Sequence, residues 1–176
     1  MATTTFQTSL VARRVDSPYG PLTIVGSTEG LRAILWDDDD PARAGVAGIR
    51  LRPGTVDAVA DAASQLEEYF AGGRTTFDLP LDLRGTAFQI AAWRVLAGIP
   101  YGETRTYAEQ AVRLGKPAAA RAVGAANGRN PLSIVLPCHR VIGSDGALRG
   151  FAGGLDVKAA LLEFERERVA RTQETG

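Results

Sequence analysis

The sequence predicts an α+β protein built in two parts, and three observations support this prediction. The N-terminal part contains a pair of strand-like segments followed by one amphipathic helix, and its net charge is negative. The C-terminal part contains several short helices, a positive net charge and the only cysteine of the chain. Strands and helices that are segregated along the chain are typical of α+β folds. We place the domain boundary near Arg84-Gly85, which gives domains 1–84 and 85–176.

The N-terminal part is expected to begin with a β-hairpin. Residues 22–25 and 31–36 are strand-like apolar runs, and residues 26–30 between them have the Gly-Ser-Thr-Glu-Gly composition of a turn. The four aspartates at 37–40, followed by Pro41, indicate a solvated loop rather than a metal site, because no second group of ligands accompanies them.

A helix and an extended segment complete the N-terminal part. Apolar side chains recur at helical spacing over residues 59–70, and Gly72 with Gly73 provides the kind of ending that helices favour. Residues 77–83 alternate between apolar and polar side chains, as a strand does. Because Pro80 cannot donate a ladder hydrogen bond, this segment should lie at a sheet edge or in a linker.

Three helices are predicted in the first half of the C-terminal part. Residues 88–99 form one apolar helical stripe. Thr106 and Glu109 form a capping box that starts a short helix, and Pro117 is placed to open another helix that continues to Ala126. The last two helices have the form of a helix-turn-helix, although an ordinary helical hairpin would give the same pattern.

The charge distribution favours a polyanionic partner for the C-terminal part. Residues 1–85 carry eight Arg against twelve acidic residues, a net charge of −4, whereas residues 86–176 carry a net charge of +4. A solvated surface can show the same split by chance. Arg121, however, is the only long side chain on a helix face otherwise made by Ala125 and Gly128. Such a face lets the helix backbone approach a nucleic-acid groove.

The only cysteine and the only histidine of the chain, Cys138 and His139, are adjacent. The apolar run at 132–136 predicts a strand that ends at Pro137, and a lone cysteine beside a strand is more often a small core residue. A free thiol has a pKa of about 8.5, so attack near neutral pH needs a base or a positive potential. His139 and Arg140 can provide them.

A final helix offers a carboxylate to orient His139. Its apolar positions should anchor it to the C-terminal part, and these are Val157, Leu161 and Phe164. The candidate carboxylates, among which spacing does not choose, are Glu163, Glu165 and Glu167.

Composition argues against several other classes of protein. The first ten residues lack the features of a signal peptide, and no apolar run approaches the roughly 18 residues that span a bilayer, so we expect a soluble, cytoplasmic protein. One cysteine forms no internal disulfide, and with one histidine it cannot supply the four ligands of a structural zinc site. We therefore expect no metal.

The segment Pro137-Cys138-His139-Arg140-Val141 resembles the O6-alkylguanine-DNA alkyltransferase family. Gly128-Arg129-Asn130-Pro131 before it and residues 150–155, Gly-Phe-Ala-Gly-Gly-Leu, after it extend the resemblance over residues 86–167, with a looser match in the N-terminal part. The resemblance implies a small ribonuclease H-like α/β domain, followed by a winged helix-turn-helix domain that carries the active site.

The same resemblance implies the reaction. A monomer would bind double-stranded DNA, flip the damaged base out of the stack, and move an alkyl group from O6 of guanine, or O4 of thymine, to Cys138. The transfer is irreversible, so each molecule would act once, without a cofactor.

The resemblance also implies a role for individual residues. Cys138 would accept the alkyl group, His139 would remove its proton through a water, and Glu165 would orient His139. Asn130 would tie the turn before the cysteine to the site. Phe151 stands where some relatives carry tyrosine, so a hydroxyl contact is not implied there. The implied substrate contacts are Tyr107, Arg121, which would fill the gap left by the flipped base, Val141, Phe151 and Ala152.

Two other functions fit parts of the sequence. A DNA-binding module that senses lesions without chemistry would share the fold, but relatives of that kind lack the cysteine. A Cys-His hydrolase would use the same two side chains, but it also needs an oxyanion hole and repeated turnover.

Overall fold

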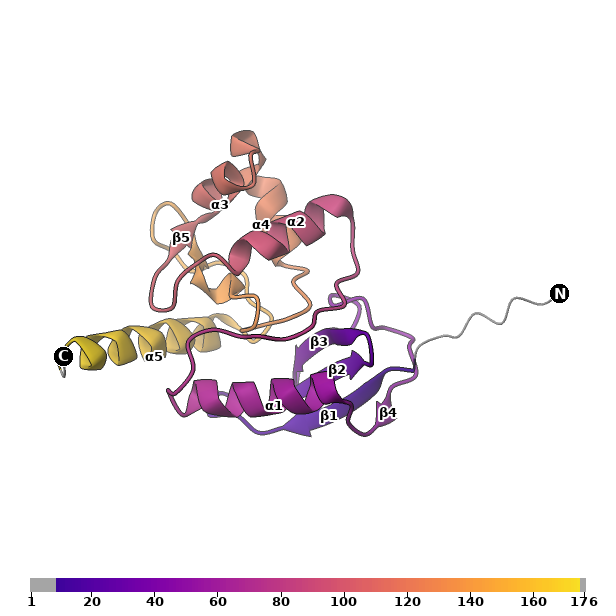
Figure 1. The fold of residues 1–176 in the computed structure, drawn as a ribbon. Coiled ribbons are helices and arrows are strands. Elements are labelled where there is room, and N and C mark those ends of the chain that lie inside the picture. The colour runs from indigo at the N-terminus through magenta and orange to yellow at the C-terminus, as the bar shows by residue number, and fades with distance from the viewer. Residues whose placement is uncertain (1–8, 175–176) are drawn as a thin grey trace.

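In the computed structural model, which describes residues 9–174, the N-terminal and C-terminal parts lie one above the other (Figure 1). The long helix α5, Leu155–Glu174, runs along the border between them. Within the described residues, no helix has both the length and the hydropathy needed to cross a membrane. The arrangement confirms the predicted α+β class.

The N-terminal part is a four-stranded sheet in the order β3-β2-β1-β4. The predicted hairpin is confirmed, with a turn of only two residues, Thr28 and Glu29, between its strands. Strands β1 and β4 lack a strong apolar pattern and were not predicted, because none of their side chains is fully buried. The strands are β1 Val11–Val15, β2 Leu22–Ser27, β3 Gly30–Trp36 and β4 Arg52–Pro53.

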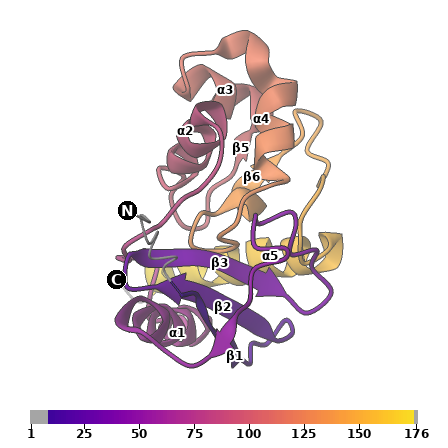
Figure 2. The ribbon, with the colours of Figure 1, turned by 90° about the vertical axis from the view of Figure 1, so that its right-hand side faces the viewer.

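Helix α1, Asp57–Phe70, covers one face of this sheet (Figure 2). The predicted helical stripe is confirmed, since its apolar side chains are buried, and Gly72 follows with a φ of +81° that favours glycine. The extended segment around Pro80 pairs with the edge of β3. Leu31 donates to the Pro80 carbonyl at 2.8 Å and accepts from the Asp82 amide at 2.9 Å.

The C-terminal part contains the predicted pair of short helices. Thr86 and Thr106 each form a complete capping box, which explains where α2 and α3 begin. A 3₁₀ turn at Pro117–Ala119 precedes α4, so the second helix of the pair starts three residues later than predicted. The helices are α2 Ala87–Leu96, α3 Tyr107–Arg113 and α4 Ala120–Asn127, and a parallel pair, β5 Arg105–Thr106 and β6 Val141–Ile142, lies beside them.

The predicted strand at 132–136 is wrong, because this segment forms turns. Asn130 accepts a hydrogen bond from the Leu132 amide at 3.0 Å and donates one to the Leu136 carbonyl at 2.7 Å. These local bonds compete with a strand ladder. Residues Cys138–Arg140 form a 3₁₀ turn, so Cys138 and His139 do not alternate across a strand.

The interpretation of residues 37–40 as a solvated loop is wrong at one position. The side chain of Asp39 is only 2% exposed and is paired with Arg43, whereas Asp37, Asp38 and Asp40 are exposed. A buried carboxylate is tolerated here because Arg43 compensates its charge.

Candidate active site

Cys138 begins the 3₁₀ turn and is 8% exposed. It contributes to the wall of a cavity of about 650 Å³. Tyr107 from α3, Arg121 and Gly124 from α4, and Arg149 from the loop after β6 also line this cavity. The sulfur is thus held in the packed interior and still faces a space large enough for a small ligand.

The thiol of Cys138 is neutral at rest. Burial raises its pKa, and this effect outweighs the hydrogen bond from Asn130 and the positive charges of Lys158 and Arg43, which lower it. A buried thiol of this kind becomes a strong nucleophile only when a base accepts its proton.

His139 is placed to act as that base. It is fully buried, and its Nε2 lies 2.8 Å from Oε1 of Glu165. Burial lowers the pKa of His139 despite the carboxylate beside it, so the ring is neutral at pH 7. With Nε2–H donating to Glu165, the lone pair is on Nδ1, and that atom has no hydrogen-bond partner within residues 9–174.

Glu165 is a buried carboxylate that accepts hydrogen bonds from several donors. Its Oε1 also accepts from the Tyr69 hydroxyl at 2.8 Å, and its Oε2 accepts from the Gly102 amide at 3.2 Å. Arg140 binds both oxygens at 2.8 Å. Burial raises the pKa of Glu165, but the hydrogen bonds from His139 and Arg140 outweigh it and lower the pKa to about 2. The carboxylate therefore stays charged and can stabilise an imidazolium.

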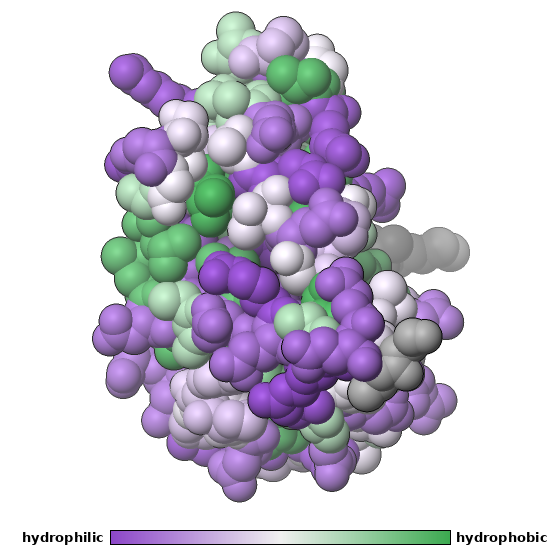
Figure 3. Space-filling model, turned by 90° about the vertical axis from the view of Figure 1, so that its left-hand side faces the viewer, coloured by the Kyte–Doolittle hydropathy of each residue, from purple (hydrophilic) through white to green (hydrophobic). Residues whose placement is uncertain are grey.

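The two neighbouring glutamates of α5 face solvent. Glu163 pairs with Arg166 at 3.3 Å and Glu167 with Arg171 at 3.6 Å, and all four side chains are more than half exposed. The face that carries the end of α5 is accordingly hydrophilic over much of its area (Figure 3). Of the three candidates, the structure thus brings only Glu165 to His139.

The sequence suggested that Arg140 supplies a positive charge to the thiol. In the structure, the charge of Arg140 is already paired. Its guanidinium forms the bidentate pair with Glu165, donates to the Ile99 carbonyl at 2.7 Å and lies 5.5 Å from the centre of the Tyr101 ring. Its charge is therefore compensated locally. The cations that act on Cys138 are instead Lys158 and Arg43.

Sequence reasoning missed Lys158, although a signal was present. Lys158, Leu161 and Glu165 share one stripe of α5 at helical spacing, and all three are fully buried. The Lys158 ammonium donates to the Val141 carbonyl at 2.6 Å and to the Arg149 carbonyl at 2.7 Å. It therefore joins β6 to the loop that follows it. Charged residues in an apolar stripe are the signal that could have identified it.

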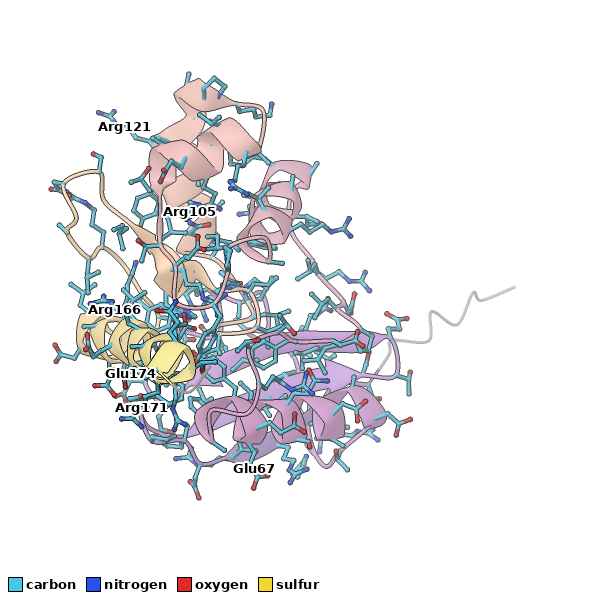
Figure 4. All side chains as sticks on the ribbon, turned by 60° about the vertical axis from the view of Figure 1, so that its left-hand side comes forward. Glu67, Arg105, Arg121, Arg166, Arg171 and Glu174 are labelled. Atoms are coloured by element: carbon cyan, nitrogen blue, oxygen red, sulfur yellow. The ribbon has the colours of Figure 1, made fainter. Side chains whose placement is uncertain are left out.

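The expected substrate contacts fall into two groups. Tyr107 and Arg121 line the cavity with Cys138, and Arg121 projects from α4 away from the rest of the protein (Figure 4). The Tyr107 hydroxyl donates to the Arg149 carbonyl at 3.1 Å. The remaining three belong to the packing of the core. Val141 is fully buried, Phe151 makes edge contacts with Trp36 and His139, and Ala152 packs against the core.

The positions of Cys138, His139 and Glu165 would allow them to act as nucleophile, base and orienting carboxylate. Within the part of the chain that the structure describes, no three His, Cys, Asp or Glu side chains come together as metal ligands would. The arrangement can thus activate one thiol toward an electrophilic atom in the cavity, next to an exposed arginine.

Comparison with known proteins matches both parts of the chain to domains of one family. Residues 87–167 match the family described as "6-O-methylguanine DNA methyltransferase, DNA binding domain", and residues 10–83 match "6-O-methylguanine DNA methyltransferase, ribonuclease-like domain".

Similar proteins are known in bacteria and archaea. A methylated-DNA–protein-cysteine methyltransferase of Mycobacterium bovis is 50% identical over 158 residues, which cover 89% of this chain and 92% of that protein. One of Methanosarcina barkeri is 46% identical, with 88% and 96% covered. The crystal structure of a Mycobacterium tuberculosis relative in complex with DNA aligns with a TM-score of 0.81 at 48% identity, over 89% of this chain and 93% of the other.

Proposed function

This chain belongs to the 6-O-methylguanine DNA methyltransferase family and repairs DNA by moving alkyl groups onto cysteine, and we propose that its only cysteine, Cys138, is the acceptor. The single observation that carries the assignment is the position of this thiol. Cys138 lies on the wall of an open cavity and is followed in the chain by His139, which is bound to the buried Glu165.

The reaction follows from these positions. Nδ1 of His139 takes the thiol proton through a water, and Sγ of Cys138 attacks the alkyl carbon on O6 of guanine. As the S–C bond forms, the C–O6 bond breaks, and its electron pair stays on the purine, which takes up a proton and remains in the DNA strand as guanine. Glu165 stabilises the imidazolium formed in the first step. O4-alkylthymine can react by the same displacement. Because the thioether is stable, each molecule acts once.

The DNA side of the proposal uses the helix pair. A base in a duplex must rotate out of the stack to reach a buried sulfur, at a cost of a few kcal/mol. We assign the vacated space to Arg121, which projects from α4 next to the cavity, and contact with the flipped nucleotide to Tyr107. Val141, Phe151 and Ala152 would shape the pocket from the core side, and Asn130 would hold the turn before the cysteine.

We extend the proposal to organisation and location. Residues 1–84 and 85–176 would be the two domains, and the matched ranges 10–83 and 87–167 support a boundary between them. The protein would act as a monomer in the cytoplasm, where reducing conditions keep a single catalytic cysteine free.

The decisive test is the mass of the peptide that contains Cys138. After incubation with a duplex that carries one O6-methylguanine, we expect this peptide to gain one methyl group, with one lesion repaired per molecule. The Cys138→Ser variant should bind the duplex and leave the lesion intact. Unmodified protein beside repaired DNA would contradict the assignment. Many turnovers per molecule would favour a hydrolase, and binding without any transfer would favour a lesion sensor.

A further inference from the structure

The active-site turn, residues 130–138, is held from outside by the N-terminal part. The backbone N–H of Ile34 in β3 donates to the Pro131 carbonyl at 2.8 Å. The guanidinium of Arg43, from the loop between β3 and β4, donates through Nη1 to the carbonyl of the preceding residue, Asn130. The N-terminal part therefore binds two successive carbonyls of the turn.

The turn needs such support because its backbone is strained. Ile134 has a φ of +74°, a conformation that costs a β-branched residue about 1–3 kcal/mol. Inside the turn, the Asn130 side chain bonds to the backbone of Leu132 and Leu136, and its interaction with Cys138 acts to lower the pKa of the thiol. A displacement of Asn130 would therefore disturb both the turn and the surroundings of the thiol.

Arg43 has a fixed position. Its Nε and Nη2 lie 2.7 and 2.5 Å from the two carboxylate oxygens of Asp39, and the two side chains are only 15% and 2% exposed. A bidentate pair holds the guanidinium plane in one orientation. The remaining Nη1 is thereby aimed at the Asn130 carbonyl.

The charge of Arg43 also reaches the thiol. Burial raises the pKa of Cys138, and Arg43 and Lys158 both act in the opposite direction. The other polar groups around the sulfur are Tyr107 of α3, whose pKa is raised by burial and then by Cys138, and the neutral His139. Among these groups only Arg43 belongs to the N-terminal part.

We propose that Arg43 is a positioning residue for alkyl transfer, through which the N-terminal part holds the turn from Asn130 to Cys138 in the geometry that the transfer requires. The inference rests on the proposed role of Cys138 as the acceptor. Under this proposal, the ribonuclease-like part contributes to the reaction through the hydrogen bond from the Arg43 side chain to the Asn130 carbonyl.

The test measures thiol reactivity as a function of pH. Iodoacetamide reports on Cys138 alone, because the chain has no other cysteine. The double variant Asp39→Asn with Arg43→Gln removes both charges and leaves no buried charge unpaired. Arg43→Lys keeps the charge and a donor. Arg14→Ala is the matched control, because it removes the exposed Arg14–Asp37 pair close by in the N-terminal part. Thermal unfolding of each variant checks the fold.

In the double variant we expect the pH–rate profile to move up by about half a unit, which is about threefold slower reaction at neutral pH. Single-turnover transfer from a methylated duplex should slow at least as much. Arg43→Lys should lie between the wild type and the double variant, because it keeps the charge but not the bidentate geometry, and Arg14→Ala should match the wild type.

Two outcomes would overturn the inference. One is an unchanged profile and transfer rate in the double variant, and the other is a loss in Arg43→Lys equal to that of the double variant. Failure of the wild-type protein to take up a methyl group would instead remove the proposed function. The iodoacetamide profiles would still show whether Arg43 acts on the thiol.

Discussion

Behind Cys138, both oxygens of Glu165 accept hydrogen bonds from three other segments of the chain, and the side chains of this cluster are buried. In front of Cys138, the cavity is bordered by the exposed Arg121 and by Tyr107, which makes a single side-chain hydrogen bond. The buried side is built for one fixed geometry, and the open side is built to accept a partner. Substitutions on the two sides should therefore fail in different assays.

The largest effect is expected on the buried side. Replacing Glu165 by alanine leaves Arg140 buried without a compensating charge, which typically costs about 3–5 kcal/mol of stability. Chemical denaturation should show this loss, and alkyl transfer should fall because His139 loses its orienting partner. Glu163→Ala, on the exposed face of the same helix, should change stability by less than about 0.5 kcal/mol. Equal losses in the two variants would contradict a special role for the buried cluster.

On the open side, Arg121→Ala should slow repair of a duplex by about ten- to a hundredfold, or about 1.4–2.7 kcal/mol of barrier. Reaction with the free base O6-benzylguanine should stay unchanged, because no duplex has to be opened. Single-turnover kinetics with the two substrates measures the difference. Arg113→Ala on α3 removes the same charge from another helix and serves as a control for simple attraction to DNA. If both substrates slowed alike, Arg121 would have no role in base flipping.

A smaller effect is expected when a single donor to Glu165, the Tyr69 hydroxyl, is removed. Tyr69→Phe removes one of its donors and should cost about 1 kcal/mol of stability. The transfer rate should change little, because His139 and Arg140 still hold the carboxylate. Tyr19→Phe changes a half-buried tyrosine that packs against Phe70, and denaturation should show a smaller loss for it. A large drop in transfer rate for Tyr69→Phe would mean that the hydroxyl itself positions His139.

The smallest effect is a pH dependence. The folded pKa of Glu165 is about 2, below the ordinary value of about 4.3. The stability that ionised Glu165 contributes is therefore complete above about pH 4.3 and is lost as the pH falls through the folded value. Between pH 6 and pH 4 the wild type should lose about 0.6 kcal/mol more than Glu165→Gln. Denaturation curves at both pH values measure the difference in stability between the wild type and Glu165→Gln. If this difference were the same at pH 6 and pH 4, the pKa of Glu165 would not be depressed.

Local signals predicted most of the secondary structure. Helical spacing identified α1 and α2, the capping box at Thr106 located α3, and two apolar runs predicted the hairpin. The failures arose where side chains bond to the backbone or to distant segments. The side chain of Asn130 bonds to the backbone of residues 132 and 136, so the apolar run between them forms turns instead of a strand. The ion pair with Arg43 keeps Asp39 buried.

The candidate site was only partly predictable for a related reason. The adjacency of Cys138 and His139 is visible in the chain, but the choice of Glu165 over Glu163 and Glu167 depends on which face of α5 is buried. The residue spacing could not supply that choice, and the family resemblance did. The contribution of Arg43 depends on contacts between the two parts and leaves no trace in the local sequence.

The position of Glu165 has a consequence for synthesis. The carboxylate lies 26 residues after His139 in the chain, and its other donors come from α1 and from the loop after α2. A ribosome exposes Cys138 well before it exposes this carboxylate, so an emerging chain carries an unassisted thiol. On the proposed mechanism, the protein therefore becomes reactive toward damaged DNA only after α5 has emerged and packed against the segments that carry His139 and Tyr69.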